Sequence, residues 1–95
     1  MQMQPTPEET RLALLKLLTA TAGPALKAGD ESKPVANQID LCIDRTKADV
    51  SEGAALIDAC APQGRAMLTQ AQKRLEQLQA LQVLEAVVSE SFGLL

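Results

Sequence analysis

The sequence has no histidine, tryptophan or tyrosine, and Phe92 is its only aromatic residue. The absence of histidine removes the usual general base and a principal zinc ligand, and the two cysteines are too far apart in sequence to form a zinc site alone. One aromatic ring gives single-stranded nucleic acid almost nothing to stack on. The five glycines are scattered, so no glycine-rich phosphate loop is present either.

Catalytic chemistry would therefore depend on carboxylates and lysines, and no recognisable set of these residues occurs. Asp40 and Asp44 are one helical turn apart and could act as paired carboxylates or bind a hard cation, but their spacing is typical of an exposed acidic helix face. We therefore expect no catalytic residues, no cofactor and no metal, and we expect that the protein is not an enzyme.

The charge is mildly acidic, with nine Lys and Arg residues against twelve Asp and Glu residues and a net charge of −3. This balance argues against nucleic acid as a partner. The N-terminus lacks the features of a secretion signal and apolar runs are short, so we expect a cytoplasmic protein without membrane association. Cys42 and Cys60 both lie in apolar helical patterns and are interpreted as reduced core residues, with a disulfide or redox switch as the alternative.

Helix signals divide the chain into a flexible leader, residues 1–6, and a single helical domain, residues 7–95. Thr6 and Pro7 are typical of a helix start, and Gly23 followed by proline is typical of a helix end. We expect an all-α fold, a small bundle of about four helices with a long C-terminal helix. The apolar spacing and the breakers between apolar segments predict helices over residues 7–22, 33–48, 50–60 and 65–92.

The last of these helices carries two apolar stripes that point in different directions. Residues from Met67 to Leu78 form the first stripe, and residues from Leu81 to Phe92 form a second one about 120° away. Either the helix bends near Gln79, or its first half covers the core while its second half offers an apolar face to another molecule. Plain core packing of both halves is the alternative.

A binding surface on the last helix is the strongest functional hypothesis. The apolar stripe would make the contact, with charged residues at its rim. The expected partner is another protein, the same chain in a homodimer, or both. The expected site residues are Leu81, Leu84, Val88 and Phe92 in the stripe and Arg74 and Glu85 at the rim.

The size, acidity and amphipathic last helix are similar to those of small bacterial or phage accessory proteins as a class. We therefore expect a non-enzymatic protein-binding module of the adaptor, chaperone, antitoxin or inhibitor type. The alternative is a structural homo-oligomeric subunit or scaffold that uses the same helix on itself. A DNA-binding regulator with a helix-turn-helix is a third hypothesis, which the acidic balance of residues 28–60 disfavours.

Overall fold

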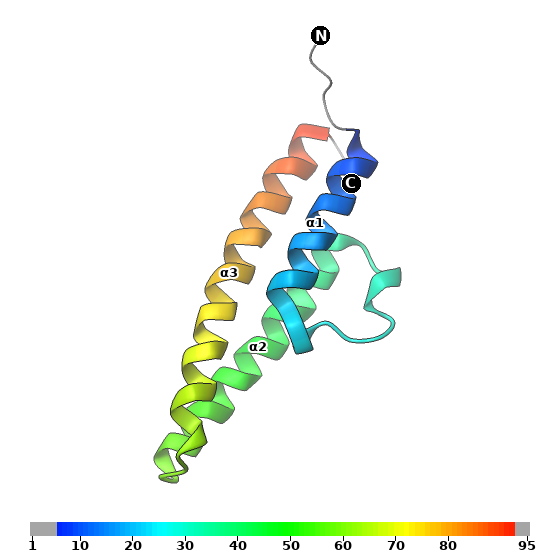
Figure 1. The fold of residues 1–95 in the computed structure, drawn as a ribbon. Coiled ribbons are helices and arrows are strands. Elements are labelled where there is room, and N and C mark those ends of the chain that lie inside the picture. The colour runs from blue at the N-terminus through cyan, green and yellow to red at the C-terminus, as the bar shows by residue number, and fades with distance from the viewer. Residues whose placement is uncertain (1–5, 93–95) are drawn as a thin grey trace.

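The computed structural model describes residues 6–92. Residues 1–5, which include most of the expected leader, and residues 93–95 lie outside the described part. Within residues 6–92 there are three α-helices, two short 3-10 turns and no strand, which confirms the all-α class and corrects the expected four helices to three. In chain order the elements are α1 (Pro7–Ala22), η1 (Gly23–Ala25), η2 (Asp30–Ser32), α2 (Val35–Asp58) and α3 (Gln63–Phe92), shown in Figure 1.

Helix α1 begins and ends where the sequence predicts. The Thr6 side chain accepts a hydrogen bond from the Glu9 backbone N–H at 3.1 Å, and Pro7 occupies the first turn. Gly23 follows the helix with a φ of 53°, a conformation that most other residues avoid. The capping side chain and the glycine therefore set both ends of α1.

Helix α2 runs without interruption through the region where two helices, 33–48 and 50–60, were expected. The start signal at Asp49–Glu52 does not interrupt α2, because no proline lies within this helix and Gly53 is its only glycine. Gly53 is buried and packs against α3, so contacts with the neighbouring helix hold this stretch helical. The prediction of a separate third helix was therefore wrong.

The end of α2 is a Schellman motif with cysteine where glycine is usual. The Ala61 N–H donates to the Leu56 carbonyl at 2.8 Å, and the Cys60 N–H donates to the Ile57 carbonyl at 2.9 Å. Cys60 has a φ of 59° and its side chain is exposed. Its interpretation as a core residue was wrong, because the left-handed turn carries it out of the helical stripe. Cys42, by contrast, is buried as expected.

The three helices differ in length, and this difference gives the molecule two distinct ends. Helices α1 and α2 run in the same direction and α3 runs antiparallel to both (Figure 1). At 1.5 Å per residue, α3 is about 45 Å long and α1 only about 24 Å. Helix α1 thus covers one end, which we call the three-helix end. Beyond it α2 and α3 continue as a pair, the hairpin arm, made of residues 47–58 and 63–74.

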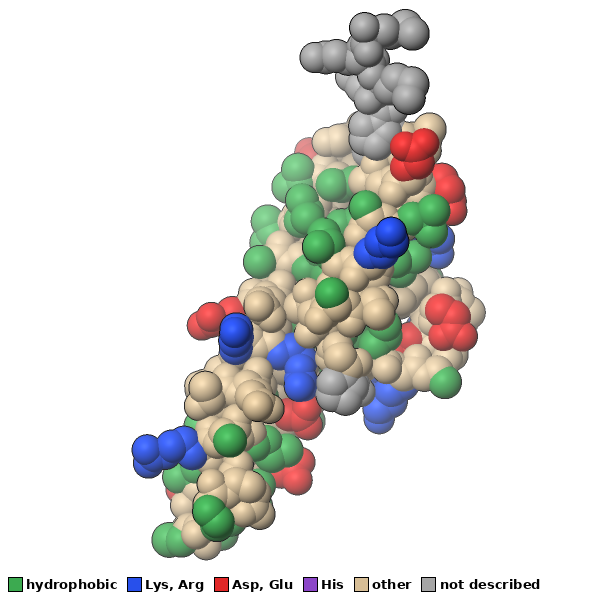
Figure 2. Space-filling view, viewed as in Figure 1, with side chains coloured by type: hydrophobic (Ala, Val, Ile, Leu, Met, Phe, Trp, Pro, Cys, Tyr) green, Lys and Arg blue, Asp and Glu red, His purple; other side chains and the backbone are tan. Residues whose placement is uncertain are grey.

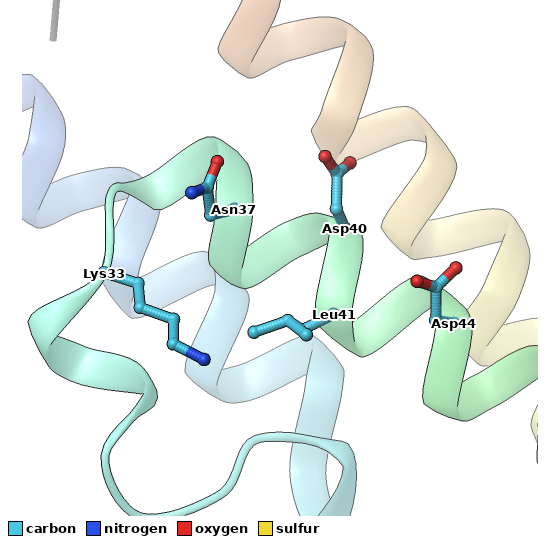
Figure 3. Close-up of a pocket in the computed structure, with 5 residues that line it drawn as sticks. All are labelled: Lys33, Asn37, Asp40, Leu41 and Asp44. Atoms are coloured by element: carbon cyan, nitrogen blue, oxygen red, sulfur yellow. The ribbon is translucent and has the colours of Figure 1, made fainter.

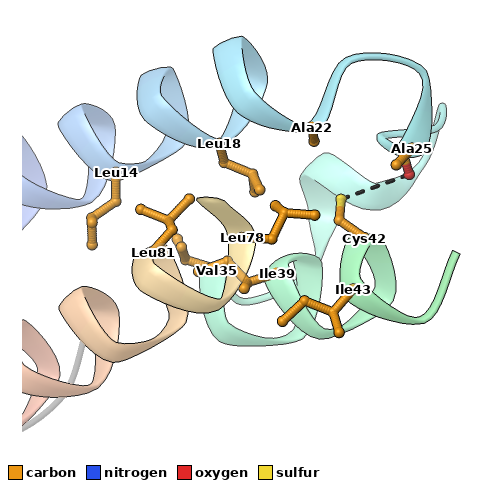
Figure 4. Packing of buried hydrophobic residues seen from close by; sticks show 10 residues of the cluster. All are labelled: Leu14, Leu18, Ala22, Ala25, Val35, Ile39, Cys42, Ile43, Leu78 and Leu81. Carbon is orange, nitrogen blue, oxygen red and sulfur yellow. Dashed lines mark hydrogen bonds between the residues drawn. The ribbon is translucent and has the colours of Figure 1, made fainter. Parts of the chain in front are cut away.

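A single apolar cluster fills the three-helix end, with side chains from all three helices and from η1 (Figure 4). Leu18, Ile39 and Leu78 are fully buried at its centre. The Cys42 thiol points at the Ala25 carbonyl, 3.6 Å away, and burial raises the pKa of this thiol. The buried members of the cluster are Leu14, Leu18, Ala22, Ala25, Val35, Ile39, Cys42, Ile43, Leu78 and Leu81.

An ion pair fastens the connection between α1 and α2 to the side of α2. Arg45 donates to the buried carboxylate of Asp30 at 2.5 Å and to the Ala25 carbonyl at 2.8 Å. The Lys27 backbone N–H donates to the same carboxylate at 2.9 Å. The Arg45 hydrogen bond, followed by the Lys27 one, lowers the pKa of Asp30 from 3.8 to about 2. The carboxylate is therefore ionised at neutral pH and holds the connection in place.

Two glycines allow the helices of the hairpin arm to approach each other closely. A Cβ atom on Gly53 would lie 2.9 Å from the Leu68 backbone nitrogen, and one on Gly64 would lie 2.7 Å from that of Ile57. Gly53 therefore has a packing role and does not belong to a helix start. Ala71, also small and buried, lies further along the same side of α3. Small residues thus hold the arm together where the apolar core is absent.

Candidate protein-binding surface

Most of the large apolar side chains that reach the surface lie at the three-helix end. Hydrophobic side chains gather there in the view of Figure 2, over α1 and the second half of α3. Leu12 and Leu17 of α1 are about half exposed, and Ile57 is the one exposed large apolar residue of the arm within the described side chains. The exposed large apolar residues of α3 are Val83, Leu84 and Val87.

The exposed residues of α3 form one surface, which we call the α3 face: Val83, Leu84 and Val87. Their exposed fractions are 64%, 44% and 55%. Val83 and Val87 are one helical turn apart, about 40° from each other around the axis, and Leu84 lies beside them. The α3 face is therefore a continuous aliphatic strip and not a set of scattered side chains.

The stretch of α3 that carries the α3 face has almost no charge of its own. Between Glu76 and Glu90 the only charged residue is Glu85. Glu85 is buried, and its carboxylate accepts a hydrogen bond from the Ser89 hydroxyl at 2.5 Å. The exposed side of α3 is thus uncharged from residue 77 to residue 89, a length of about 20 Å.

The structure divides the expected site residues between the core and the surface. Leu81 is buried in the core cluster, and Val88 is half-buried and packs against that cluster. Leu84 belongs to the α3 face. The Phe92 side chain lies outside the described part of the structure, so its place in the expected site stays a prediction. The expected stripe therefore points at the edge of the core, and only Leu84 among its described side chains is an exposed residue.

The two expected rim residues have other contacts. Arg74 lies in the hairpin arm, where its guanidinium donates to the Asp49 carboxylate at 3.2 Å and links α3 to α2. Glu85 is turned into the molecule beside Ser89. The structure does not bring either residue to the rim of the α3 face.

Val83 and Val87 were missing from the expected site. Val87 lies in the second apolar stripe and Val83 lies outside it, and periodicity locates such a stripe without telling which of its residues the neighbouring helices cover. The absence of any charge opposite that stripe was the signal that could have identified them. A solvated helix face normally carries charged residues, and the outward side of α3 carries none from residue 77 to residue 89.

The cavities of the described part do not bring reactive groups together. One of about 310 Å³ is lined by Lys33, Asn37, Asp40, Leu41 and Asp44. Figure 3 shows that both carboxylates point away from Lys33, and the Asp40 carboxylate accepts a hydrogen bond from the Gln82 amide at 2.7 Å. Within residues 6–92, no three His, Cys, Asp or Glu side chains are grouped so that they could hold a metal ion.

The comparisons with known proteins identify no relative. Protein-family models gave no match to the sequence, and the curated proteins and the solved structures gave none either. None of the helices within residues 6–92 has both the length and the apolar character required to cross a membrane.

Proposed function

We propose that the protein is a non-enzymatic, cytoplasmic protein-binding module that captures its partner on the α3 face. The observation that carries this proposal is the aliphatic strip of Val83, Leu84 and Val87, which is about half exposed and lies in a stretch of α3, residues 77–89, whose one charged residue, Glu85, is buried. Exposed aliphatic residues that occur singly are common, but a continuous strip of them usually marks an interface. The proposed role is that of an adaptor, chaperone, antitoxin or inhibitor.

The strip is large enough to supply useful affinity. Full burial of one valine or leucine side chain is worth about 1.5–3 kcal/mol, so covering the exposed halves of three would contribute about 3 kcal/mol. That contribution corresponds to a factor of about 100 in the dissociation constant. The α3 face can therefore act as the central apolar contact of an interface whose rim is polar.

The charges at the ends of the strip indicate what the partner looks like. Glu76 and Glu90 are exposed and bound the uncharged stretch of α3 on both sides. A complementary partner would present an apolar helix face or groove of about 20 Å with lysine or arginine at its ends. A second copy of this chain fits poorly on the same face, because identical acidic ends would approach each other in an isologous pair.

The test compares two double variants of α3. Val83→Glu with Val87→Glu places two charges on the α3 face, whereas Gln70→Glu with Gln72→Glu places two on exposed positions of the same helix three turns or more before it. The immobilised wild-type chain and the glutamine control should retain the same partner from an extract of the source cells at a fixed stoichiometry. The valine variant should lose it while keeping its helical circular dichroism. Equal retention by all three would refute the proposal.

A further inference from the structure

The hairpin arm separates its charges between its two helices. Its α2 part, residues 47–58, carries one lysine and three acids, a net charge of −2, and its α3 part, residues 63–74, carries three bases and no acid. Within the described residues, the ion pair of Asp49 with Arg74 is the only one that links the two parts. The charges of the arm that have no opposite charge within 4.0 Å in residues 6–92 are Lys47, Glu52, Asp58, Arg65 and Lys73, all exposed.

The apolar side chains of the arm are only half covered. Val50 and Leu56 of α2 and Met67 and Leu68 of α3 are neither buried nor fully exposed. Two helices can shield only the sides that they turn to each other, and α1 ends before it reaches this part (Figure 1). Stable helical bundles usually place further helices against such a pair.

We propose that the hairpin arm binds the arm of a second copy of this chain, with α2 of one copy against α3 of the other. The two arms then form a four-helix bundle in which a helix segment of net charge −2 faces one of net charge +3 at both contacts. The half-covered apolar side chains on the side of each arm that meets the partner close the centre of this bundle. The contact is symmetric, so the assembly ends at two copies.

The charge distribution also fixes the orientation of the two copies. A twofold axis parallel to the helices places α2 against α3 and brings both arm tips to the same end. A twofold axis across the helices, in the plane of contact, places α2 against α2 and α3 against α3. Like net charges then face each other, which is unfavourable. The first arrangement is therefore the one that the sequence favours.

This dimer is independent of the α3 face. The arm and the α3 face occupy different parts of α3, and a dimer joined through the arms would carry two copies of the α3 face. Variants of one surface therefore leave the other unchanged. Val83→Glu with Val87→Glu should dimerise like the wild type, so failure of the dimer and failure of the proposed function are distinguishable.

Charge reversal tests the pairing directly. Glu52→Lys with Asp58→Lys makes the α2 part of the arm positive, and Arg65→Glu with Lys73→Glu makes the α3 part negative. Sedimentation equilibrium at low ionic strength should show that each variant alone dimerises at least about tenfold more weakly than the wild type. An equimolar mixture of the two should dimerise again, because each reversed segment then faces a segment of opposite charge.

The matched control is Glu8→Lys with Glu90→Lys, which changes the net charge as much as Glu52→Lys with Asp58→Lys but lies at the other end of the molecule (Figure 1). It should dimerise within about threefold of the wild type. A wild-type chain that is monomeric at every concentration would overturn the proposal. So would reversed variants that dimerise normally, or a mixture that shows no recovery.

Cross-linking through Cys60 tests how the two copies are oriented in the dimer. It is exposed at the tip of the arm, whereas Cys42 is buried. A thiol-specific bismaleimide should therefore join the two copies through Cys60 in the dimer, and Cys60→Ser should abolish the product. In the opposite orientation the two tips would be separated by about one arm length, roughly 18 Å, so a bismaleimide with a short spacer would not join them. A dimer without cross-linking would overturn the proposed arrangement.

Discussion

The two ends of the molecule are held together in different ways, although the same two helices run through both. At the three-helix end, large aliphatic side chains such as Leu18, Ile39 and Leu78 are fully buried among three helices. In the hairpin arm only two helices are present, and the contact depends on small residues that allow the backbones to approach. We infer that apolar burial stabilises the first end, whereas backbone proximity and a partner stabilise the second.

The difference follows from how many sides of a helix are covered. A helix with one neighbour can bury only a narrow strip, and small residues shorten the distance to that neighbour. A helix with two neighbours buries a wide arc, which large side chains fill. The two apolar stripes of α3 correspond to these cases. The first faces α2 alone in the arm and enters the three-helix core at Leu75 and Leu78, and the second is shared between the core and the α3 face.

The largest expected effect is at the three-helix end. Leu18→Ala removes a fully buried side chain and should lower the free energy of unfolding by about 3 kcal/mol through lost burial and the cavity left behind. Val50→Ala in the arm, where the side chain is only half-buried, should lower it by about 1 kcal/mol or less. Urea unfolding of both variants measures the difference. Equal losses would contradict the distinction between the two ends.

A second effect is specific to the arm. Gly64→Ala forces a methyl group into the Ile57 backbone and should destabilise the chain by about 1–3 kcal/mol through overpacking. Ser51→Ala, at an exposed position of the same arm, should change stability by less than about 0.5 kcal/mol. Hydrogen exchange should show that the Gly64 variant loses protection in the arm first. Uniform loss over all three helices would argue against an independently held arm.

A smaller effect concerns the connection between α1 and α2. Because the pKa of Asp30 is lowered from 3.8 to about 2 in the folded protein, its contribution to stability is complete above about pH 4 and is lost as the pH falls towards 2. Asp30→Asn should remove this part of the acid dependence and lower the melting temperature at pH 7. Thermal unfolding of the wild type and the variant from pH 2 to pH 7 measures both effects. An unchanged acid profile would show that the pair with Arg45 does not form in solution.

The smallest expected effect is a gain in stability. Cys60 holds a φ of 59° at the end of α2, and glycine adopts this conformation without strain. Cys60→Gly should therefore raise the free energy of unfolding by about 0.5–1 kcal/mol. Ala59→Gly, one residue earlier and at a negative φ, should lower it instead. A loss of stability in the Cys60 variant would contradict the Schellman motif.

Much of the fold could be predicted because its signals are local. Thr6, Pro7 and Gly23 mark the ends of α1 through hydrogen bonds and dihedral angles within a few residues of each other. The helix predicted over 65–92 agrees closely with α3 (Gln63–Phe92) for a similar reason, since no glycine or proline interrupts it after residue 64. The capping signal at Asp49 predicted a helix start that the structure does not have, because the packing of Gly53 on α3 outweighs that signal.

The candidate site was less predictable. Leu84 was identified, but Leu81 and Val88 could be separated from Val83 and Val87 only when the position of α1 was known. Arg74 has a partner, Asp49, that lies 25 residues away in sequence. No local pattern encodes that contact.

The sequence by itself determined that the chain is helical and where most helices end, because helix formation and capping depend on residues within one or two turns. It also determined which chemistry the chain lacks, since a side chain that is absent cannot act. Only the tertiary structure decided which side of α3 remains exposed, that α2 is continuous, and that Asp30 meets Arg45. These outcomes depend on the relative lengths and positions of α1, α2 and α3, which bring distant residues together.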